Sequence, residues 1–298
     1  MNITIEETLA SSDVVTALTD APYLIYSEIL EGSRRSLVFL EVAMEIKELI
    51  GVTGNRYQFL KASQLEATKS TESAMLSGMS ASDKSMSAVD VSITDIIWSA
   101  VQLSDFLLED FPEHGMLQFH VKNMGSAVME YLDSYVYSTI SGASGVLTHS
   151  CASLDYDELI DAVTVAKNAD WSPNPANPPA LICSAGATAG LLKDTDFITT
   201  ERYTTAQVAN MVQGEQGHYA GLRVLESSLL DGVGYAFIVF PNDTDAGIVV
   251  GLVYKRDMKT VSEYFAKNGY TYLNSSIRAT PVVVQAEGIV KITITSSP

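Results

Sequence analysis

The chain has 298 residues, of which 47% are hydrophobic, and its formal net charge is −18 from 36 acidic and 18 basic residues. This length and hydrophobic fraction predict a folded protein of about two domains and argue against wholesale disorder. The acidic excess argues against sequence-independent binding to nucleic acid, which needs clustered Lys and Arg. The basic doublets Arg34-Arg35 and Lys255-Arg256 are interpreted as solvated surface charges.

The N-terminal region, residues 1–20, is polar and rich in Thr and Ser, and it predicts an extended arm. It has neither the basic n-region nor the apolar core of a signal peptide, so we expect synthesis in a cytosol. The apolar runs are far shorter than the ~20 residues that span a bilayer, so we expect no membrane association. After Pro22, apolar residues recur at helical spacing up to Leu49, and Gly51 and Gly54 are expected to end this helix.

Residues 54–95 predict a protruding two-stranded arm. Residues 56–60 and 89–93 alternate in polarity as strands do. Between them, the tract 70–87 consists of small and polar residues with isolated methionines, too few apolar groups for a core. Because a lone hairpin is only marginally stable in water, we expect this arm to lie on another subunit.

A long helix follows. Residues 95–108 have mixed apolar spacing and predict a short helix or a strand-to-helix link. Pro112 then opens a helix that Gly142 ends, about 45 Å long at 1.5 Å per residue. Its apolar residues step by four and three and predict one continuous seam, made of Leu117, Val121, Met124, Val128, Tyr131 and Tyr135.

The next segment combines a capped helix, a buried strand and a glycine-rich turn. Asp155 and Glu158 have capping-box spacing at the start of a helix predicted over 155–168, and residues 180–183 predict a short buried strand. A second capping box, at Thr204, heads a helix that is expected to stop at Gly214. The segment 214–228 contains Gly214, Gly217 and Gly221, which permit positive φ, and it predicts a tight turn leading into a strand.

The C-terminal third is expected to be mostly strand. Residues 235–240 and 247–254 are apolar and predict a hairpin joined by the turn-rich link 241–246. Residues 258–267 predict a helix that stops at Asn268-Gly269. Two β-rich stretches, 281–285 and 289–295, end the chain.

The sequence predicts no catalytic, cofactor-binding or metal-ligating residues. Cys151 and Cys183 make neither a disulfide framework nor a zinc site, and they are interpreted as buried, reduced thiols. A catalytic triad of a Ser with His149 and Asp155 could be assembled on paper, but serine is common and no residue spacing singles out one, so the sequence does not support it. His149 and the other three histidines, His114, His120 and His218, are interpreted as surface or packing histidines. Asp243 and Asp245 alternate in a turn, which favours an acidic loop tip over a calcium site. We therefore expect no enzyme activity.

The order of these elements resembles that of the major capsid proteins of tailed viruses, which have the α+β Hong Kong 97 fold. The resemblance implies an N-terminal arm and helix (1–53), an extended loop or E-loop (54–95), a peripheral domain with the spine helix (96–152) and an axial domain (153–257). It also implies that residues 258–298 return to the peripheral domain as terminal strands. In this family the glycine-rich turn belongs to the domain around the five- and six-fold axes.

The resemblance implies a structural role in a virion that assembles in the host cytoplasm. The partners would be copies of this chain in hexamers and pentamers, a portal, and scaffold or decoration proteins. The shell would enclose double-stranded DNA without sequence-specific binding, and a net-acidic inner wall would suit its packaging and release. Assembly roles are expected for a small set of residues: Arg34, Arg35, Lys61, Lys69, Lys84, Gly214, Gly217 and Gly221.

Several alternatives stay open at this level. An encapsulin-like nanocompartment shares the fold but would enclose cargo enzymes instead of a genome. A decoration or tail subunit is a second alternative, although the long helix argues against a tail tube. A hydrolase on a mixed α/β scaffold is a third. No scaffold-like helical extension precedes residue 1, so the resemblance leaves a separate scaffold or a cleaved form open, and no Asn stands out as a cross-link partner for a Lys.

Overall fold

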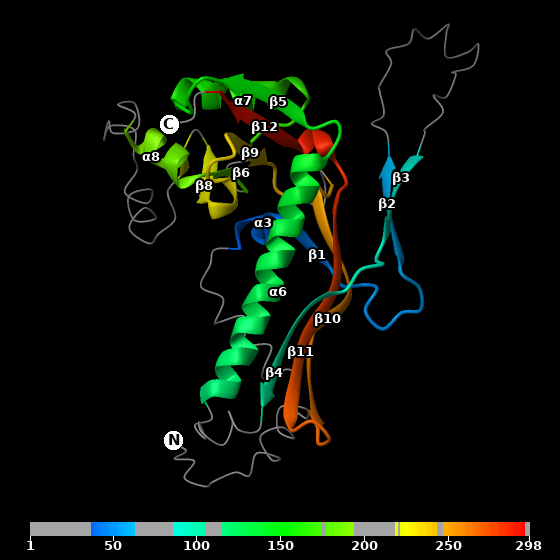
Figure 1. Cartoon of the computed structure of the whole chain (residues 1–298). Coiled ribbons are helices and arrows are strands. Elements are labelled where there is room, and N and C mark those ends of the chain that lie inside the picture. The colour runs from blue at the N-terminus through cyan, green and yellow to red at the C-terminus, as the bar shows by residue number, and fades with distance from the viewer. Residues whose placement is uncertain are drawn as a thin grey trace, which may run out of the picture.

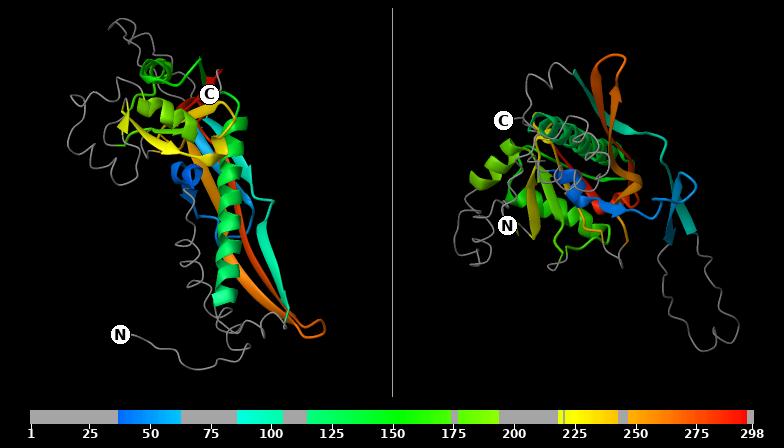
Figure 2. Two further views of the ribbon diagram at one scale, coloured as in Figure 1. Left: turned by 60° about the vertical axis from the view of Figure 1, so that its left-hand side comes forward. Right: turned by 90° about the horizontal axis from the view of Figure 1, so that it is seen from below.

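The computed structural model describes residues 37–62, 86–104, 115–173, 177–193, 218–219, 221–242 and 247–295. The protein is elongated, with a long helix lying along a narrow sheet and a second sheet gathered at one end of that helix (Figures 1 and 2). The predicted helix at 204–214, the tract 70–85 and the acidic turn at 243–246 lie outside the described residues.

The narrow sheet has four strands in the order β1-β10-β11-β4. Their bounds are β1 (Met44–Ile46), β4 (Ile97–Ser104), β10 (Val250–Phe265) and β11 (Tyr270–Val283). Neighbouring strands are antiparallel, except that β1 runs parallel to β10. Alternate residues of β11, such as Leu273 and Ile277, are buried on one face, where the helix α6 packs. The two faces of this sheet therefore differ, because only one carries α6.

The long helix α6 (Gly115–Gly142) confirms the predicted spine, and its 28 residues correspond to about 42 Å. The predicted seam holds through Val121, Met124 and Val128, but Tyr131 is 62% exposed, so the end of the seam is wrong. Beyond Val128 the buried stripe continues through Leu132, Val136 and Ile140. From Val128 the buried residues step by four, whereas the predicted seam steps by three to Tyr131, so that side chain lies on the other edge of the stripe and is exposed.

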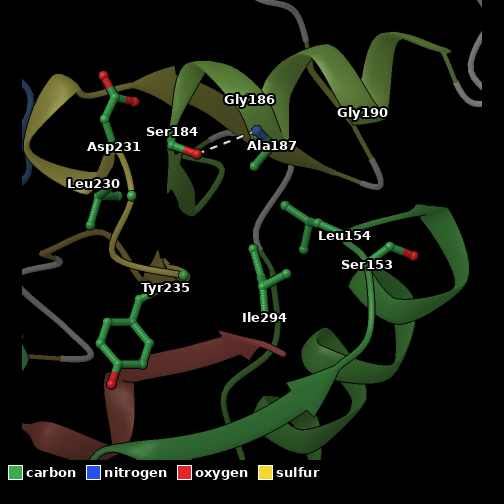
Figure 3. Close-up of a pocket in the computed structure, with 12 residues that line it drawn as sticks. Ser153, Leu154, Ser184, Gly186, Ala187, Gly190, Leu230, Asp231, Tyr235 and Ile294 are labelled. Atoms are coloured by element: carbon green, nitrogen blue, oxygen red, sulfur yellow. Dashed lines mark hydrogen bonds between the residues drawn. The ribbon is translucent and has the colours of Figure 1, made fainter. Parts of the chain in front are cut away.

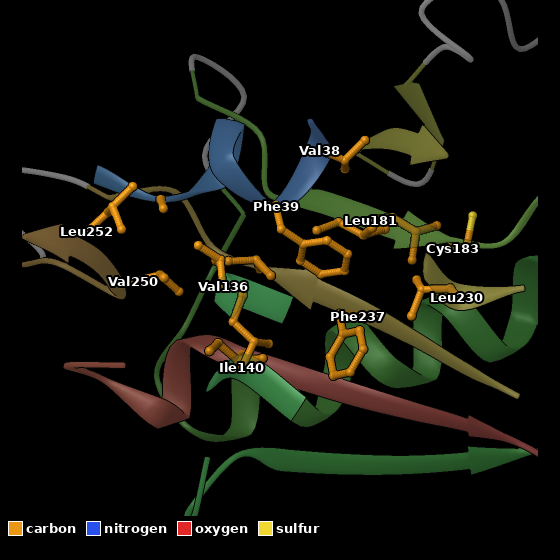
Figure 4. Close-up of a cluster of buried hydrophobic side chains, with 14 of the residues drawn as sticks. Val38, Phe39, Val136, Ile140, Leu181, Cys183, Leu230, Phe237, Val250 and Leu252 are labelled. Carbon is orange, nitrogen blue, oxygen red and sulfur yellow. The ribbon is translucent and has the colours of Figure 1, made fainter. Parts of the chain in front are cut away.

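The second sheet has six strands in the order β5-β12-β9-β6-β8-β7. Their bounds are β5 (Leu147–Cys151), β6 (Ala180–Cys183), β7 (His218–Tyr219), β8 (Leu222–Glu226), β9 (Tyr235–Val239) and β12 (Ile289–Ile294). Helix α7 (Tyr156–Asn168) packs on β5 and β12, and α8 (Ala185–Lys193) follows β6. Leu181 and Phe237 are fully buried here and meet Phe39, Val136 and Ile140 in one continuous core (Figure 4).

The predicted two-stranded arm is confirmed within the described residues. Strands β2 (Arg56–Ala62) and β3 (Met86–Ser92) pair antiparallel and project from the side of the body (Figure 1). A small separate core anchors the base of this hairpin, with Phe59, Val91 and Ile93 packed against Val253 of β10. The hairpin is thus held at its base and extends away from the sheets.

Part of the predicted N-terminal helix is wrong. Helix α3 (Val38–Val42) ends well before Leu49, because Ala43 is extended and β1 begins at Met44. Strand β1 pairs with Gly251–Val253 of β10, more than 200 residues away. Backbone pairing to a distant strand overrides the local helical spacing.

The helix predicted over 258–267 is also wrong, and of the two alternatives for 95–108 the short helix is wrong, since a strand leads toward α6. Residues 97–104, within the predicted helix or link at 95–108, form the strand β4, and residues 258–265 continue β10. Residues 260–265 pair with 270–275 of β11 across the turn at Asn268-Gly269. The β-branched and aromatic residues of both stretches, Val261 and Phe265 among them, suit this half-buried ladder.

The predicted hairpin of residues 235–254 is wrong as well. Strand β9 belongs to the six-stranded sheet and β10 to the four-stranded sheet. Both edges of β9 are already paired, one with β12 and the other with β6. No hydrogen-bonding edge of β9 is left for β10, and the chain crosses to the other sheet. The two predicted C-terminal stretches, 281–285 and 289–295, also belong to different sheets. The first contains the end of β11, in the four-stranded sheet beside α6, whereas the second contains β12, in the six-stranded sheet.

Candidate assembly surfaces

The hairpin β2–β3 offers the most extended surface of the described chain. Leu60, on its outer part, is 68% exposed. Lys61 is half-buried and lines a hollow beside the C-terminal end of α6, with Thr139, Gly145 and Pro281. Of the three lysines predicted in the extended loop, Lys61 is the one that the structure describes, and Lys69 and Lys84 lie outside.

The junction between α3 and α6 contains a buried carboxylate that the sequence did not single out. Asp133 of α6 is 4% exposed, and its Oδ1 accepts a hydrogen bond from the backbone N–H of Leu40 at 2.9 Å. Burial raises the pKa of Asp133 to about 6, although the bonds from the Leu40 and Phe39 amides oppose the rise. This contact fixes the start of α3, just where the chain emerges from the N-terminal region, outside the described residues.

A second junction joins the two sheets through Asn242, in the turn-rich link that follows β9. Its Nδ2 donates to the carbonyl oxygen of Val42 at 2.9 Å, while its Oδ1 accepts from the amides of Val249 at 2.8 Å and Val250 at 3.1 Å. One side chain therefore binds the end of α3 and the start of β10. Nearby, Arg223 of β8 forms an ion pair with Glu41 of α3 at 2.8 Å.

The glycine-rich segment is described from His218 onward, with Ala220 excepted. Strands β7 and β8 pair antiparallel, and Gly221 lies in the turn between them with φ +79°. The predicted turn and strand are confirmed there, and positive φ explains the requirement for glycine. Gly214 and Gly217 lie outside the described residues, as do Arg34 and Arg35.

The doublet Lys255-Arg256 is not the freely solvated pair that its sequence indicates. The Nζ of Lys255 donates to the carbonyl oxygen of Leu49 at 3.2 Å and also to that of Val52. The Nη2 of Arg256 donates to Ser276 Oγ at 2.7 Å across the β10–β11 ladder. The partners Leu49, Val52 and Ser276 lie far from the doublet in the sequence, so the residues next to the doublet give no sign of these contacts.

A pocket of about 470 Å³ opens at one end of the six-stranded sheet, where α8 approaches β9 and β12 (Figure 3). Its wall consists largely of small and apolar residues, including Gly186, Ala187 and Gly190. Among the described residues of its lining, Asp231 and the phenol of Tyr235 are the ionisable side chains. This lining lacks the paired base and nucleophile that hydrolytic chemistry needs.

The remaining candidates for chemistry have structural roles. The Nε2 of His149 meets Glu158 Oε2 at 2.7 Å, so it joins β5 to α7 instead of completing a triad with Asp155. Asp155 caps α7 by accepting the N–H of Glu158, which confirms the predicted helix start and its cap, whereas the Glu158 carboxylate contacts His149. Cys151 and Cys183 are buried free thiols, as predicted. Among the described residues, no group of three His, Cys, Asp or Glu could hold a metal, and no helix could span a bilayer.

Comparison with solved structures decides the fold. The capsid of cyanophage P-SCSP1u matches with a TM-score of 0.69 at 14% identity, over 100% of this chain and 93% of that one. The chain has a phage capsid fold. The capsid of cyanophage Pam1 matches with a TM-score of 0.68 at 11% identity, over 89% of this chain and 94% of that one. A virus-like particle from Pyrococcus furiosus matches with a TM-score of 0.59 at 15% identity, over 90% and 97%.

The likeness to capsid structures extends over nearly the whole chain. No protein-family model and no curated protein sequence matches this chain. The structural matches nevertheless span nearly all of both chains, so the expected α+β capsid fold is confirmed for the whole body and not for one module.

Proposed function

We propose that this chain is a major capsid protein that self-assembles into an icosahedral virus head enclosing double-stranded DNA. The observation that carries this proposal is the near-complete coverage in both directions of phage capsid structures. The charge of −18 supports it, because an acidic shell attracts packaged DNA only weakly. The predicted role is structural and involves no catalysis.

Within this proposal, α6 is the spine of a peripheral domain and the hairpin β2–β3 begins an extended loop that reaches a neighbouring subunit. The hairpin's projection from the body supports a partner for it, because a lone two-stranded hairpin is only marginally stable in water. The six-stranded sheet with Gly221 would supply the axial domain. Portal and scaffold or decoration proteins are proposed partners, and the host cytoplasm is the proposed place of assembly.

Negative-stain microscopy of the expressed protein tests the proposal most directly. We expect closed shells, or hexamers and pentamers, over a range of salt concentration and pH. Compact monomers under all these conditions would contradict it. Small DNA-free shells filled with an enzyme would assign the chain to the nanocompartment alternative instead.

The extended loop can be tested separately. Replacing the tract that begins at Ser70 and ends before β3 with a short turn keeps both strands of the hairpin. We expect the unfolding midpoint of the monomer to be unchanged, since the tract is too polar to contribute a core. The assembled particle should dissociate at lower temperature or lower denaturant concentration. Equal stability of the wild-type and shortened particles would argue against an intersubunit role for the loop.

A further inference from the structure

Two arginines stand directly opposite each other in the narrow sheet. The register of β10 and β11 pairs Arg256 with Arg278, beside irregularities on either side of Arg256. Like charges at opposed positions of an antiparallel pair repel each other, and such pairs are destabilising. Arginine cannot relieve the repulsion by losing its proton. An opposed arginine pair therefore needs an anion or a strong compensating contact.

Both guanidinium groups lie on the face of the sheet away from α6. Residues of β11 that face α6 are buried, as Ile277 and Ala279 are, whereas Ser276 and Arg278 alternate with them on the other face. Arg256 donates to Ser276 Oγ, and Arg278 Nη2 donates to the carbonyl oxygen of Ile93 at 3.2 Å. These bonds hold the two groups in place but leave both charges uncompensated.

No carboxylate of the described chain forms an ion pair with either arginine, and the buried Oδ1 of the neighbouring Asp257 has no hydrogen-bond partner either. The ion pairs between described residues involve Lys47, His149 and Arg223, and none involves Arg256 or Arg278. The Nε atoms of both arginines are buried and without a hydrogen-bond partner in the described structure. Two uncompensated cations are unexpected in a chain with twice as many acidic as basic residues.

The surface around the pair has the composition of a protein contact. Trp98 of β4 stands opposite Ser276 in the register, hence on the same face, and it is 61% exposed. Val261 of β10 is 41% exposed on this face, opposite Asn274. Exposed Trp beside Arg is the combination enriched at the energetic centres of protein interfaces. A free inorganic anion would not account for the exposed apolar groups.

The base of the hairpin β2–β3 covers only part of this sheet face. The small core of Phe59, Val91 and Ile93 packs over Val253, and the bond from Arg278 to Ile93 marks the edge of the covered part. The arginine pair and Trp98 thus lie next to the edge of the hairpin, where the covered part of the sheet face meets the part that the hairpin leaves uncovered. We call this region, Trp98, Arg256, Val261 and Arg278, the outer-sheet surface.

We propose that the outer-sheet surface binds a second copy of this chain, with the two arginines receiving a carboxylate and Trp98 packing against an apolar group beside it. The occupant follows from charge, because a chain of net charge −18 presents carboxylates on any copy that approaches. This inference rests on the proposed shell function. It adds the residues that form the contact and the chemistry that they recognise.

The first test compares two double variants of equal charge change. Arg256→Gln/Arg278→Gln removes the pair, and Lys122→Gln/Lys167→Gln removes two exposed cations from α6 and α7. We expect the subunit concentration at half-maximal assembly to be about tenfold higher for the arginine variant than for wild type, which is the effect of losing one energetically central contact of an interface. The lysine control should assemble as wild type does. The unfolding midpoint of the arginine variant as a monomer should stay equal or rise, because the repulsion is gone.

The outcomes separate this contact from the proposed function. If the wild type does not assemble at all, both the shell function and the contact are wrong. If the wild type and the arginine variant assemble alike, only the contact is wrong. A third outcome is that the unfolding midpoint of the monomeric arginine variant falls as much as the stability of its particles. That result would mean that the carboxylate bound by the two arginines belongs to the same chain, and it would overturn the proposal. Loss of DNA binding without loss of assembly would assign the arginines to phosphate and also overturn it.

The second test identifies the carboxylate. Arg278→Lys keeps the charge and introduces an amine, and particles assembled from a mixture of ¹⁴N and ¹⁵N subunits are treated with a carbodiimide, which joins amines to carboxylates in contact. We expect mixed-isotope cross-links between the peptide carrying position 278 and an acidic peptide of another copy. Cross-links confined to a single isotope would show an intrachain partner and contradict the inference.

Discussion

Asp133 of α6 accepts a hydrogen bond from the backbone N–H of Leu40 at 2.9 Å, and this bond joins segments that are 93 residues apart. It connects the long helix, which supports the narrow sheet, to the short helix α3 that leads in from the N-terminal region. The carboxylate is almost inaccessible to water, so its ionisation is coupled to the packing of these two helices.

The stability of the protein should depend on pH through Asp133. Burial raises the pKa of Asp133 from 3.8 to about 6, so between these values the folded state binds more protons than the unfolded state. The contribution of this group to stability is therefore complete below the unfolded pKa and is lost as the pH rises through about 6. Asp133→Asn keeps the acceptor for Leu40 and removes the ionisation.

We expect the free energy of unfolding of Asp133→Asn, relative to wild type, to rise by about 1–2 kcal/mol between pH 4 and pH 7, after a discount for partial solvent screening. Denaturant titrations at several pH values measure this difference. Asp161→Asn, on the exposed face of α7, controls for the loss of one negative charge. A difference that does not vary with pH would contradict the role of Asp133.

Asn242→Ala should destabilise the junction between the sheets. The substitution leaves the carbonyl of Val42 and the amides of Val249 and Val250 without their side-chain partner. We expect a loss of about 2–3 kcal/mol in the free energy of unfolding, because buried backbone groups lose their hydrogen bonds. Asn268→Ala, in the exposed turn after β10, is the matched control and should change stability little. Similar effects of the two substitutions would show that the junction is not specific to Asn242.

Gly221→Ala should strain the turn between β7 and β8. The backbone of Gly221 has φ +79°, and an added Cβ would meet no neighbouring atom, so the cost is conformational and not steric crowding. We expect a loss of about 1 kcal/mol from the left-handed conformation alone. Gly142→Ala, at the end of α6 where φ is not positive, should be neutral or stabilising. Under the proposed function, the Gly221 variant should also assemble less completely, and normal shells would make this segment an ordinary turn.

Cys183 and Cys151 should both be unreactive in the folded protein. Cys183 is fully buried, its Sγ lies 3.2 Å from Thr188 Oγ1, and burial raises its pKa to about 11. Burial also raises the pKa of Cys151. We expect a thiol-specific reagent at pH 8 to label neither cysteine in the native state and both after denaturation, because the thiolate is the reacting species. Rapid labelling of Cys183 in native protein would contradict its burial.

Much of the local structure could be predicted because its determinants lie close together in the sequence. The cap at Asp155 needs only Glu158, three residues away, and the strands β2 and β3 follow from alternation over a few positions. The helix predicted over 258–267 failed because its true partner is β11, across a turn that lies beyond the predicted element. The assembly roles predicted for Lys61, Gly221 and the other six residues stay predictions, and of these eight residues the structure describes Lys61 and Gly221.

The contacts of Arg256, Arg278 and Asp133 could not be predicted for the same reason, because their partners are distant in the sequence. The sequence around Arg278 carries no signal, and Arg256 is interpreted from sequence as a solvated charge, because nothing local indicates that the two stand opposite each other. Asp133 sits among apolar helix residues, and its partner Leu40 lies on another element. Only a register or a tertiary contact brings such groups together.

By itself, the sequence determined the long helix, the capped helix α7, the hairpin arm, the buried thiols and, through the order of these parts, the resemblance to capsid proteins. Only the tertiary structure decided that β9 and β10 belong to different sheets, that β1 replaces the end of a helix, and that two arginines share one open face. The physical reason is that helix periodicity and capping depend on residues within one or two turns. Strand partnership depends instead on which backbone edges remain unpaired, and those edges come from segments that can lie more than 200 residues apart.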